Sequence, residues 1–352
     1  MSRFNGLKEI SRRQFARSGL LTAASLAWPA LRAQPKLERA KLSLAVGGKA
    51  SFQHLPLMLA EQLGYFRAEG LDLEITDHPS SARAAQALVN GAADVSASAF
   101  EHLIPLQSRT QWVQAFAIQA RTPLITFGVS TRSMPGYKSL ADLKGKKIGV
   151  AATGSSAYMV AKLVLGRAGV NTGEVTFVDA GSVSNALVAL RSGQLDAISH
   201  TDPAMTMLEQ KGDIKIISDT RTLKGTLAVF GGAMPTACLC ASREFIQKNP
   251  NTCQALTNAI VHALKWLHTA GPGDVIKTVP EAYLLGDRGL YLAAFNNVRE
   301  SISLDGLMPE DGARTVLRAV ASVDPSVRAE KIDLPRTYTN EFAQRAKERF
   351  KA

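Results

Sequence analysis

Cysteines and aromatic residues are scarce in this sequence, and the common catalytic patterns are absent. Only 3 of the 352 residues are cysteines and 6% are aromatic. Neither a disulfide-rich scaffold nor an aromatic nucleic-acid surface is therefore expected. The sequence contains no G-x-S-x-G, H-E-x-x-H, Walker or C-x-x-C pattern. We therefore predict no catalytic residues, no metal site and no cofactor.

The three cysteines leave two states open. Cys238 and Cys240 alternate along an expected strand, so both face the same side. An odd number excludes complete intramolecular pairing. Either all three are buried thiols, or Cys253 forms a disulfide with one of the others.

The N-terminus has the features of an export signal. Residues 11–15 read S-R-R-Q-F, which matches the twin-arginine pattern, and an apolar run follows at 19–31. That run is shorter than the roughly 20 apolar residues of a spanning helix. The alternative is an ordinary secretion signal with two chance arginines. In either case we expect residues 1–33 to be removed and the mature chain to lie in the periplasm.

The net charge gives little support for nucleic-acid binding. The formal charge is +11, but six basic residues and one acidic residue precede Gln34, so the mature chain carries about +6. These charges are spread along the chain without a basic block. They indicate a mild attraction for anions and no nucleic-acid partner.

A repeat with an offset of 102 residues organises the rest of the sequence. The pattern D-x-x-S followed by A-L-x-x-G-x-x-D occurs at 77–94 and again at 179–196. Each copy reads strand–helix–strand–helix–strand, which is typical of a parallel sheet covered by helices. The predicted fold class is α/β, with two βαβαβ-based lobes and a ligand cleft between them. Asp94 and Asp196 receive the same structural role in this scheme.

The second copy lies between two apolar segments, 124–129 and 236–241, that we expect to form strands crossing between the lobes. Lobe 2 then comprises 127–238, and lobe 1 comprises 34–126 and 239–352, completed by C-terminal helices. A long helix is expected from about 243 to 268, kinked at Pro250.

The repeat also predicts where a ligand binds. In parallel α/β sheets, ligands bind outside the carboxyl ends of the strands, where helices begin with free N–H groups. Six loops fall there, and all are rich in Ser, Thr, Gly or His. Candidate ligand-binding residues in the first copy are Lys49, Ser51, Phe52, Gln53, His54, Ser80, Ser81, Ser98, Phe100 and His102. Candidates in the second copy are Thr153, Gly154, Ser155, Ser156, Gly181, Ser182, His200 and Asp202.

Each candidate serine has two interpretations, because serine is also a preferred helix cap. The sharpest candidates are the consecutive Gly154, Ser155 and Ser156, where hydroxyls and a helix N-terminus are expected to meet an oxyanion. Lys49 either adds a positive charge or is solvated. A polar heterocycle stacked on Phe52 or Phe100 is the alternative ligand.

Two blocks carry a family resemblance. L-G-Y-F at 63–66 with E-G-L-D at 69–72, and S-L-A-D-L-K-G-K-K at 139–147, resemble nitrate/sulfonate/taurine-type solute-binding proteins, relatives of the thiamine-pyrimidine-precursor-binding proteins. The resemblance covers about 42–300. It implies a type II periplasmic-binding fold, whose lobes close by hinge bending on a small polar or anionic molecule. It also implies a monomer that delivers this molecule to an ABC permease and its ATPase. The family often has glycines where this chain has Ser80 and Ser81, so the ligand stays unassigned.

Two other functions remain open from the sequence. The first is an enzyme on the same fold, such as a pyrimidine-precursor synthase or a sulfinate-cleaving relative. The synthases that the resemblance includes are intracellular and carry a cysteine cluster, in contrast to this chain. The second is a periplasmic ligand sensor, which has the same sequence features as a transport protein.

Overall fold

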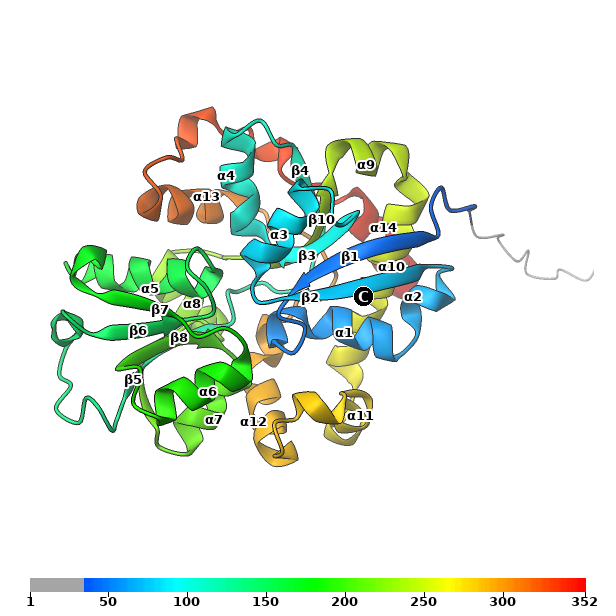
Figure 1. Cartoon of the computed structure of the whole chain (residues 1–352). Coiled ribbons are helices and arrows are strands. Elements are labelled where there is room, and N and C mark those ends of the chain that lie inside the picture. Colours follow the sequence, from blue (N-terminus) through cyan, green and yellow to red (C-terminus); the bar gives the residue numbers. More distant parts are fainter. Residues whose placement is uncertain (1–34) are drawn as a thin grey trace, which may run out of the picture. The chain divides into compact units, whose positions relative to one another are not determined.

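Two five-stranded mixed sheets, each covered by helices, make up the part of the chain that the structure describes, residues 35–352 (Figure 1). The structure is a computed structural model. Residues Leu37–Ala352 form one unit, and the predicted α/β fold with two lobes is confirmed. The expected export signal lies outside the described residues. No helix of 35–352 has the length and apolar character needed to cross a membrane.

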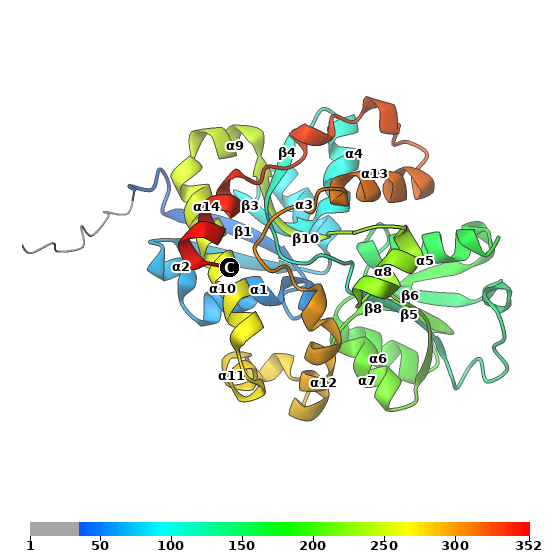
Figure 2. The ribbon, with the colours of Figure 1, turned by 180° about the vertical axis from the view of Figure 1, so that it is seen from behind.

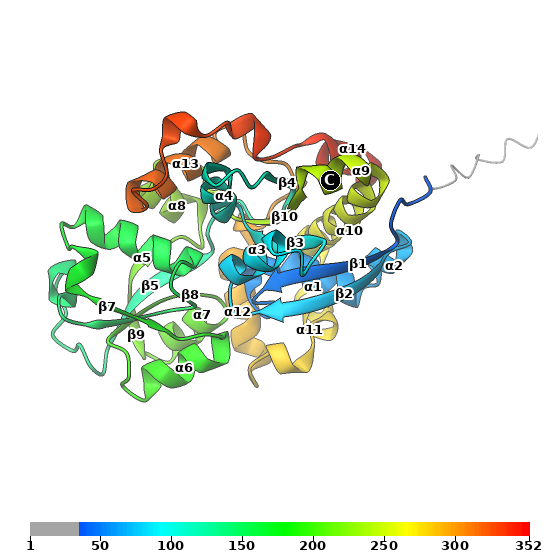
Figure 3. The ribbon, with the colours of Figure 1, turned by 45° about the horizontal axis from the view of Figure 1, so that its top comes forward.

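The two sheets have the same strand order. The first sheet has the order β2 (Asp72–His78), β1 (Lys41–Gly47), β3 (Val95–Ala99), β10 (Ala237–Ser242) and β4 (Val113–Ile118). The second has the order β7 (Thr176–Asp179), β6 (Lys147–Val150), β8 (Ala197–Thr201), β5 (Ile125–Ser130) and β9 (Ile214–Asp219). In each sheet the first three strands are parallel, and the fourth is antiparallel to both neighbours. The arrowheads of β1 and β2 point toward the second sheet in Figure 3.

The 102-residue repeat is confirmed by the positions of matching elements. The helices α3 (Ser81–Val89) and α6 (Val183–Arg191) follow the second strand of each copy at that offset. Asp94 Oδ2 accepts a hydrogen bond from Ser43 N at 3.0 Å, and Asp196 Oδ2 accepts one from Lys147 N at 3.0 Å. Each aspartate therefore ties the start of the third strand to the start of the first, the structural role predicted for both.

Helices cover both faces of each sheet. On one face of the first sheet lie α1 (Leu55–Gln62), α2 (Tyr65–Ala68) and α10 (Pro250–Thr269), and on the other lie α3 and α4 (Leu103–Ser108). The second sheet packs on α5 (Ser156–Arg167) and α8 (Leu223–Phe230) on one face, and on α6 and α7 (Ala204–Gln210) on the other (Figure 1). The sheets are the scaffold on which loops at their facing edges are held.

The chain crosses between the lobes along residues 119–124 and 231–236. Gln119 N donates to Ala237 O at 2.7 Å, and Thr236 N donates to Ala120 O at 3.2 Å. The two connecting segments are therefore hydrogen-bonded to each other. The apolar segments predicted to cross form β5 and β10, and each of these strands begins just after a crossing.

The C-terminal helices contact both lobes (Figure 2). Helix α14 (Glu341–Phe350) packs on α10, whereas α12 (Arg288–Val298) packs on α7 and α13 (Gly312–Val323) packs on α5. One apolar cluster runs from Ile104 of the first lobe through Val316 to Val160 of the second. Residues 239–352 were expected to complete lobe 1, and within that range α12 and α13 also contact lobe 2. The intervening α11 spans Pro272–Thr278.

Pro250 divides the long helix expected from 243 to 268. Helix α9 (Arg243–Lys248) ends before Asn249, and α10 starts at Pro250. Proline has no N–H and its ring clashes with a preceding helical turn, so it fits only the first turn. The expected kink is thus a complete break.

All three cysteines are buried free thiols, which decides between the two states that the sequence left open. Short 3-10 helices complete the described chain: η1 (Phe52–His54), η2 (Phe100–His102), η3 (Leu140–Leu143), η4 (Thr172–Glu174), η5 (Glu281–Tyr283), η6 (Arg299–Ser301), η7 (Ala329–Lys331) and η8 (Leu334–Arg336).

Candidate functional site

A cavity of about 380 Å³, here called the cleft, lies where loops of the two lobes face each other. Its walls come mainly from the carboxyl ends of the parallel strands β1, β2 and β8 and from the loops that follow β1, β2, β6 and β7. Nine of the residues predicted from the sequence line it: Ser51, Gln53, Ser80, Ser81, Ser155, Ser156, Gly181, Ser182 and His200.

Three helices begin at the cleft. Ser80, Ser155 and Ser182 are the N-cap residues of α3, α5 and α6, and each side chain accepts a backbone N–H of its own helix. The positive ends of three helix dipoles therefore converge on one cavity, an arrangement that favours an anion. The capping and ligand interpretations are compatible, because a hydroxyl that accepts one hydrogen bond retains its own proton to donate.

The first helical residues add two more hydroxyls. Ser156 is only 4% exposed, and its Oγ is buried without a hydrogen-bond partner among the described residues. Ser81 Oγ lies 3.3 Å from His54 Nε2. A buried hydroxyl without a hydrogen-bond partner destabilises the folded state. The Ser156 hydroxyl is therefore the strongest candidate in the cleft for a hydrogen bond to a ligand.

Gly47 allows β1 to end directly against α3. A Cβ atom at this position would lie 2.3 Å from both N and Cα of Ser81, which no real side chain tolerates. Glycine at position 47 therefore allows the N-terminus of α3 to pack directly against the end of β1.

The histidine of the second lobe is held as a neutral donor and acceptor. His200 Nε2 lies 3.2 Å from Gly181 O, and Nδ1 lies 3.4 Å from Thr201 Oγ1. A carbonyl oxygen only accepts, so we assign the proton to Nε2 and the acceptor role to Nδ1. Burial lowers the pKa of His200, which keeps the ring uncharged at neutral pH.

The His54 side chain is fully buried and does not line the cleft. Burial lowers its pKa from the ordinary 6.5 to about 4. Between about pH 6.5 and pH 4, His54 is protonated in the unfolded chain but not in the folded chain. The free energy of unfolding therefore falls as the pH drops through this range. The full loss is about 3 kcal/mol, since one pKa unit corresponds to about 1.4 kcal/mol.

His54→Gln is therefore expected to be less sensitive to acid than the wild type. Urea unfolding between pH 4.5 and pH 8 measures this, and the quantity compared is the difference between the two proteins. The difference in the free energy of unfolding between the two proteins should be constant above about pH 6.5. Below that pH the wild type should lose stability relative to the variant. Parallel curves over the whole range would show that His54 does not titrate abnormally.

The cleft is lined by neutral donors, with no lysine or arginine among the described lining residues. Lys49, proposed as a source of positive charge, pairs with Glu61 at 2.5 Å and does not line the cavity. Among the described lining residues Asp77 is the one carboxylate, and its Oδ1 accepts from Gly48 N and Lys49 N at 3.1 and 2.9 Å. Asp77 thus shapes the β1 loop.

Both aromatic candidates are buried in packing contacts away from the cleft. Phe52 meets Tyr291 edge to face, with ring centroids 4.8 Å apart, and Phe100 packs near Tyr338 at 6.3 Å. Neither lines the cavity, so in this structure neither presents a ring for stacking.

The other polar candidates support the loops instead of lining the cleft. Ser98 Oγ donates to Ser81 O at 2.7 Å, and Thr153 Oγ1 donates to Asp179 Oδ1 at 2.8 Å. Asp202 is buried beside Arg221, and its backbone oxygen accepts from Phe52 N of the other lobe.

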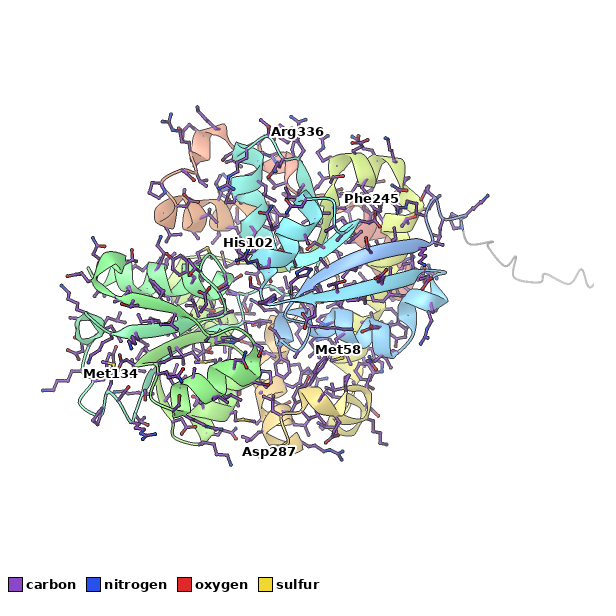
Figure 4. All side chains as sticks on the ribbon, in the orientation of Figure 1. Met58, His102, Met134, Phe245, Asp287 and Arg336 are labelled. Atoms are coloured by element: carbon purple, nitrogen blue, oxygen red, sulfur yellow. The ribbon has the colours of Figure 1, made fainter. Side chains whose placement is uncertain are left out.

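The last two candidates face a different cavity. His102 and Gly154 line a space of about 250 Å³ between η2, α5 and α13. Figure 4 shows His102 at the junction of the two lobes.

Several lining residues were missed from the sequence. Asp77, His78, Pro79 and Thr201 lie in the predicted loops but were not among the predicted ligand-binding residues. The other missed residues are Gly47, Gly48, Ala50, Ile125, Ala151, Ala157, Val183 and Asn185. Ile125 could not be predicted, because it lies at the start of β5 and not in a loop after a parallel strand.

Comparison with known proteins places this geometry in a family context. The model of the NMT1/THI5-like family matches residues 51–270. YtlA of Bacillus subtilis (strain 168), whose name gives it an inferred binding role, is 22% identical over 66% of this chain and 68% of its own. A 4-amino-5-hydroxymethyl-2-methylpyrimidine phosphate synthase of Schizosaccharomyces pombe is 24% identical over 62% of this chain and 63% of its own.

Solved structures share the fold. A protein of Bordetella bronchiseptica RB50 is 51% identical, with a TM-score of 0.88 over 90% of this chain and 100% of its own. The alkanesulfonate-binding protein SsuA of Xanthomonas axonopodis pv. citri, bound to MOPS, has a TM-score of 0.65 at 19% identity, over 86% of this chain and 100% of its own. The periplasmic nitrate-binding protein NrtA of Synechocystis PCC 6803 has a TM-score of 0.69 at 12% identity, over 89% of each chain.

Proposed function

This chain belongs to the NMT1/THI5-like family, and on that premise we propose that it is a periplasmic solute-binding protein of an ABC importer. It captures a small organic anion, of the sulfonate or carboxylate type, in the cleft between its lobes. It acts as a monomer and delivers the anion to a membrane permease that is driven by an ATPase. The observation that carries the proposal is the convergence of three helix N-termini and the unpartnered Ser156 hydroxyl on one cavity.

The chemistry of the cleft favours a singly charged oxyanion. Each helix N-terminus offers free N–H groups and about half a positive charge. The hydroxyls of Ser80, Ser81, Ser155, Ser156 and Ser182 add donors around the same space. A metal ion or an organic cation finds no matching set of carboxylates there, since Asp77 is engaged by backbone N–H groups. We propose that closure bends the connecting segments 119–124 and 231–236 and brings the lobe of the first sheet onto the lobe of the second.

A thermal-shift screen tests the proposal. Methanesulfonate, ethanesulfonate, acetate and nitrate are compared with neutral methanesulfonamide, which has the shape of the first compound without its charge. An anion at about 100 times its Kd adds roughly 2.7 kcal/mol to the free energy of unfolding. We expect at least one organic anion to stabilise the protein and the sulfonamide to have no effect. Stabilisation by the neutral compound alone would contradict the anion proposal.

An enzyme is the second candidate, favoured by the similarity to the Schizosaccharomyces synthase. The two candidates differ in what happens to the bound compound. Mass spectrometry of the ligand after long incubation with the protein distinguishes them, because a binding protein returns it unchanged. A new product that forms only with the folded protein would favour the enzyme.

The export route gives a separate prediction. Changing Arg12→Lys together with Arg13→Lys should leave the precursor in the cytoplasm, because the twin-arginine pathway requires the pair. Fractionation of cells followed by N-terminal sequencing of the exported form measures the result, and we expect a mature N-terminus near Gln34. Unchanged export of the variant would show that the ordinary secretion route is used instead.

A further inference from the structure

We propose that a groove at the connection between the lobes binds a second anion, a phosphate-type oxyanion with two negative charges. This hinge groove has a volume of about 690 Å³, and its lining includes Arg121, Asp219, Thr222, His268, Arg299 and Glu300. Arg121 belongs to the connecting segment 119–124, Thr222 caps α8, and Arg299 follows α12. Figure 2 shows α8 and α12, the helices whose ends flank this groove. The cleft and the hinge groove share no lining residue.

Two arginines in the groove have partners that carry no net charge. Arg121 donates to the backbone oxygen of Glu300. Arg299 donates to the backbone oxygens of His268 and Ala270 at 2.9 and 3.2 Å. Neither guanidinium forms an ion pair within residues 35–352, and Nε of Arg121 is buried without a hydrogen-bond partner there. Neither positive charge is therefore neutralised by a direct ion pair within the described residues.

The carboxylates that line the same groove are already engaged. Asp219 pairs with Arg221 at 2.6 Å. Glu300 Oε1 accepts from Leu223 N at 3.1 Å, at the start of α8. These contacts hold both acids in other roles, which leaves Arg121 and Arg299 to an external anion.

The arginine side chains are also held in place before any anion binds. Two carbonyl oxygens fix one end of the Arg299 guanidinium, and its Cζ lies 5.6 Å from the centre of the Phe295 ring. Each guanidinium retains further N–H groups in a planar fork, a shape that matches two oxygens of a phosphate group. Little side-chain freedom is lost on binding, because the fork is pre-positioned.

His268 can supply a third positive charge to the groove. Burial lowers its pKa, and the nearby charges of Arg299 and Arg121 lower it further. Its Nε2 lies 3.1 Å from Ser303 O and donates to it, so Nδ1 is free to take up a proton. A dianion between the two arginines would reverse the local field and favour that proton. The groove thus provides two fixed charges and one inducible charge, which suits hydrogen phosphate better than a monoanion.

Calorimetric titration with inorganic phosphate at constant ionic strength tests the groove. Arg121→Gln removes one fixed charge and should weaken phosphate binding at least about tenfold. The matched control is Arg132→Gln, an exposed arginine that also donates to a backbone oxygen, that of Arg191, outside the groove. We expect the control to bind phosphate as the wild type does. Equal weakening in both variants would mean that phosphate only screens the net charge, and would overturn the proposal.

NMR on the wild-type protein provides a readout that does not depend on a variant folding. Phosphate should raise the pKa of His268, followed through its ring proton. The same titration on the double variant Ser155→Ala, Ser156→Ala separates this site from the cleft, because the His268 shift should persist there. An unchanged His268, or a shift that disappears with the two serines, would overturn the proposal and leave the function of the cleft untouched.

Discussion

Replacement of Arg221 by leucine is expected to lower the free energy of unfolding by about 3–5 kcal/mol. The Arg221 side chain is 5% exposed and contacts three carboxylates, Asp219 at 2.6 Å, Glu209 at 3.0 Å and Asp202 at 3.5 Å. Asp202 is completely buried, so removing the arginine leaves an uncompensated charge inside the second lobe. Such a charge is far more costly than the lost attraction itself.

The protonation of Asp202 makes this effect depend on pH. Burial raises the pKa of Asp202 to about 6, and the attraction of Arg221 and the hydrogen bond from Thr206 N oppose that rise only in part. A carboxyl group with a raised pKa stabilises the fold below its unfolded pKa, and this stability is lost as the pH rises through about 6. The Arg221→Leu variant is therefore expected to lose more stability at pH 8 than at pH 5.

Urea unfolding measures both parts of this prediction. The matched control is Arg191→Leu, which removes an arginine whose pair with Asp213 is 43% and 30% exposed. Such a surface pair contributes at most about 1 kcal/mol. Adding Asp202→Asn to Arg221→Leu should restore part of the stability, because no buried charge is then left. Losses of equal size in the Arg221 and Arg191 variants would show that Asp202 is not a buried charge.

The double change Ser155→Ala, Ser156→Ala is expected to weaken anion binding at least tenfold. Each lost hydroxyl that donates to a charged group costs about 1.5–3 kcal/mol, and 1.4 kcal/mol is a factor of ten. Ser155 caps α5 through Tyr158 N, whereas Ser156 Oγ has no partner within the described residues. Ser156→Ala alone should therefore account for most of the loss in affinity while changing stability little.

Folding of the double variant should survive, because a lost cap costs only about 1 kcal/mol. The matched control is Ser242→Ala, which removes the cap of α9 outside the cleft. We expect it to lose similar stability and to keep full affinity in calorimetric titration. Unchanged affinity in the double variant would reduce these serines to caps and remove the main support for the anion.

Local sequence signals were sufficient for the scaffold and for the edge of the sheets where the cleft lies. The repeat placed α3 and α6, and the loops after parallel strands supplied Ser80, Ser155 and Ser182 as helix caps. These features depend on residues within a few positions of one another, because strand periodicity and capping are local properties. The edge of a parallel sheet then follows from the connections alone.

Side-chain direction and distant partners were not accessible in the same way. Phe52 and Phe100 lie in the predicted loops, but they point into packing contacts with Tyr291 and Tyr338, far along the chain. Lys49 was expected either to face the ligand or to be solvated, but its ammonium group pairs with the carboxylate of Glu61. Each of these outcomes depends on tertiary packing between segments that no local pattern relates.

The anion site is tested most directly by a crystal structure with a bromoalkanesulfonate, once a thermal-shift assay has shown that this compound binds. The anomalous signal of bromine identifies the compound and its orientation. The sulfonate should lie between the N-termini of α3, α5 and α6, with an oxygen about 2.7–2.8 Å from Ser156 Oγ. A sulfonate located in the hinge groove or on the surface, with the three helix N-termini unoccupied, would contradict the account.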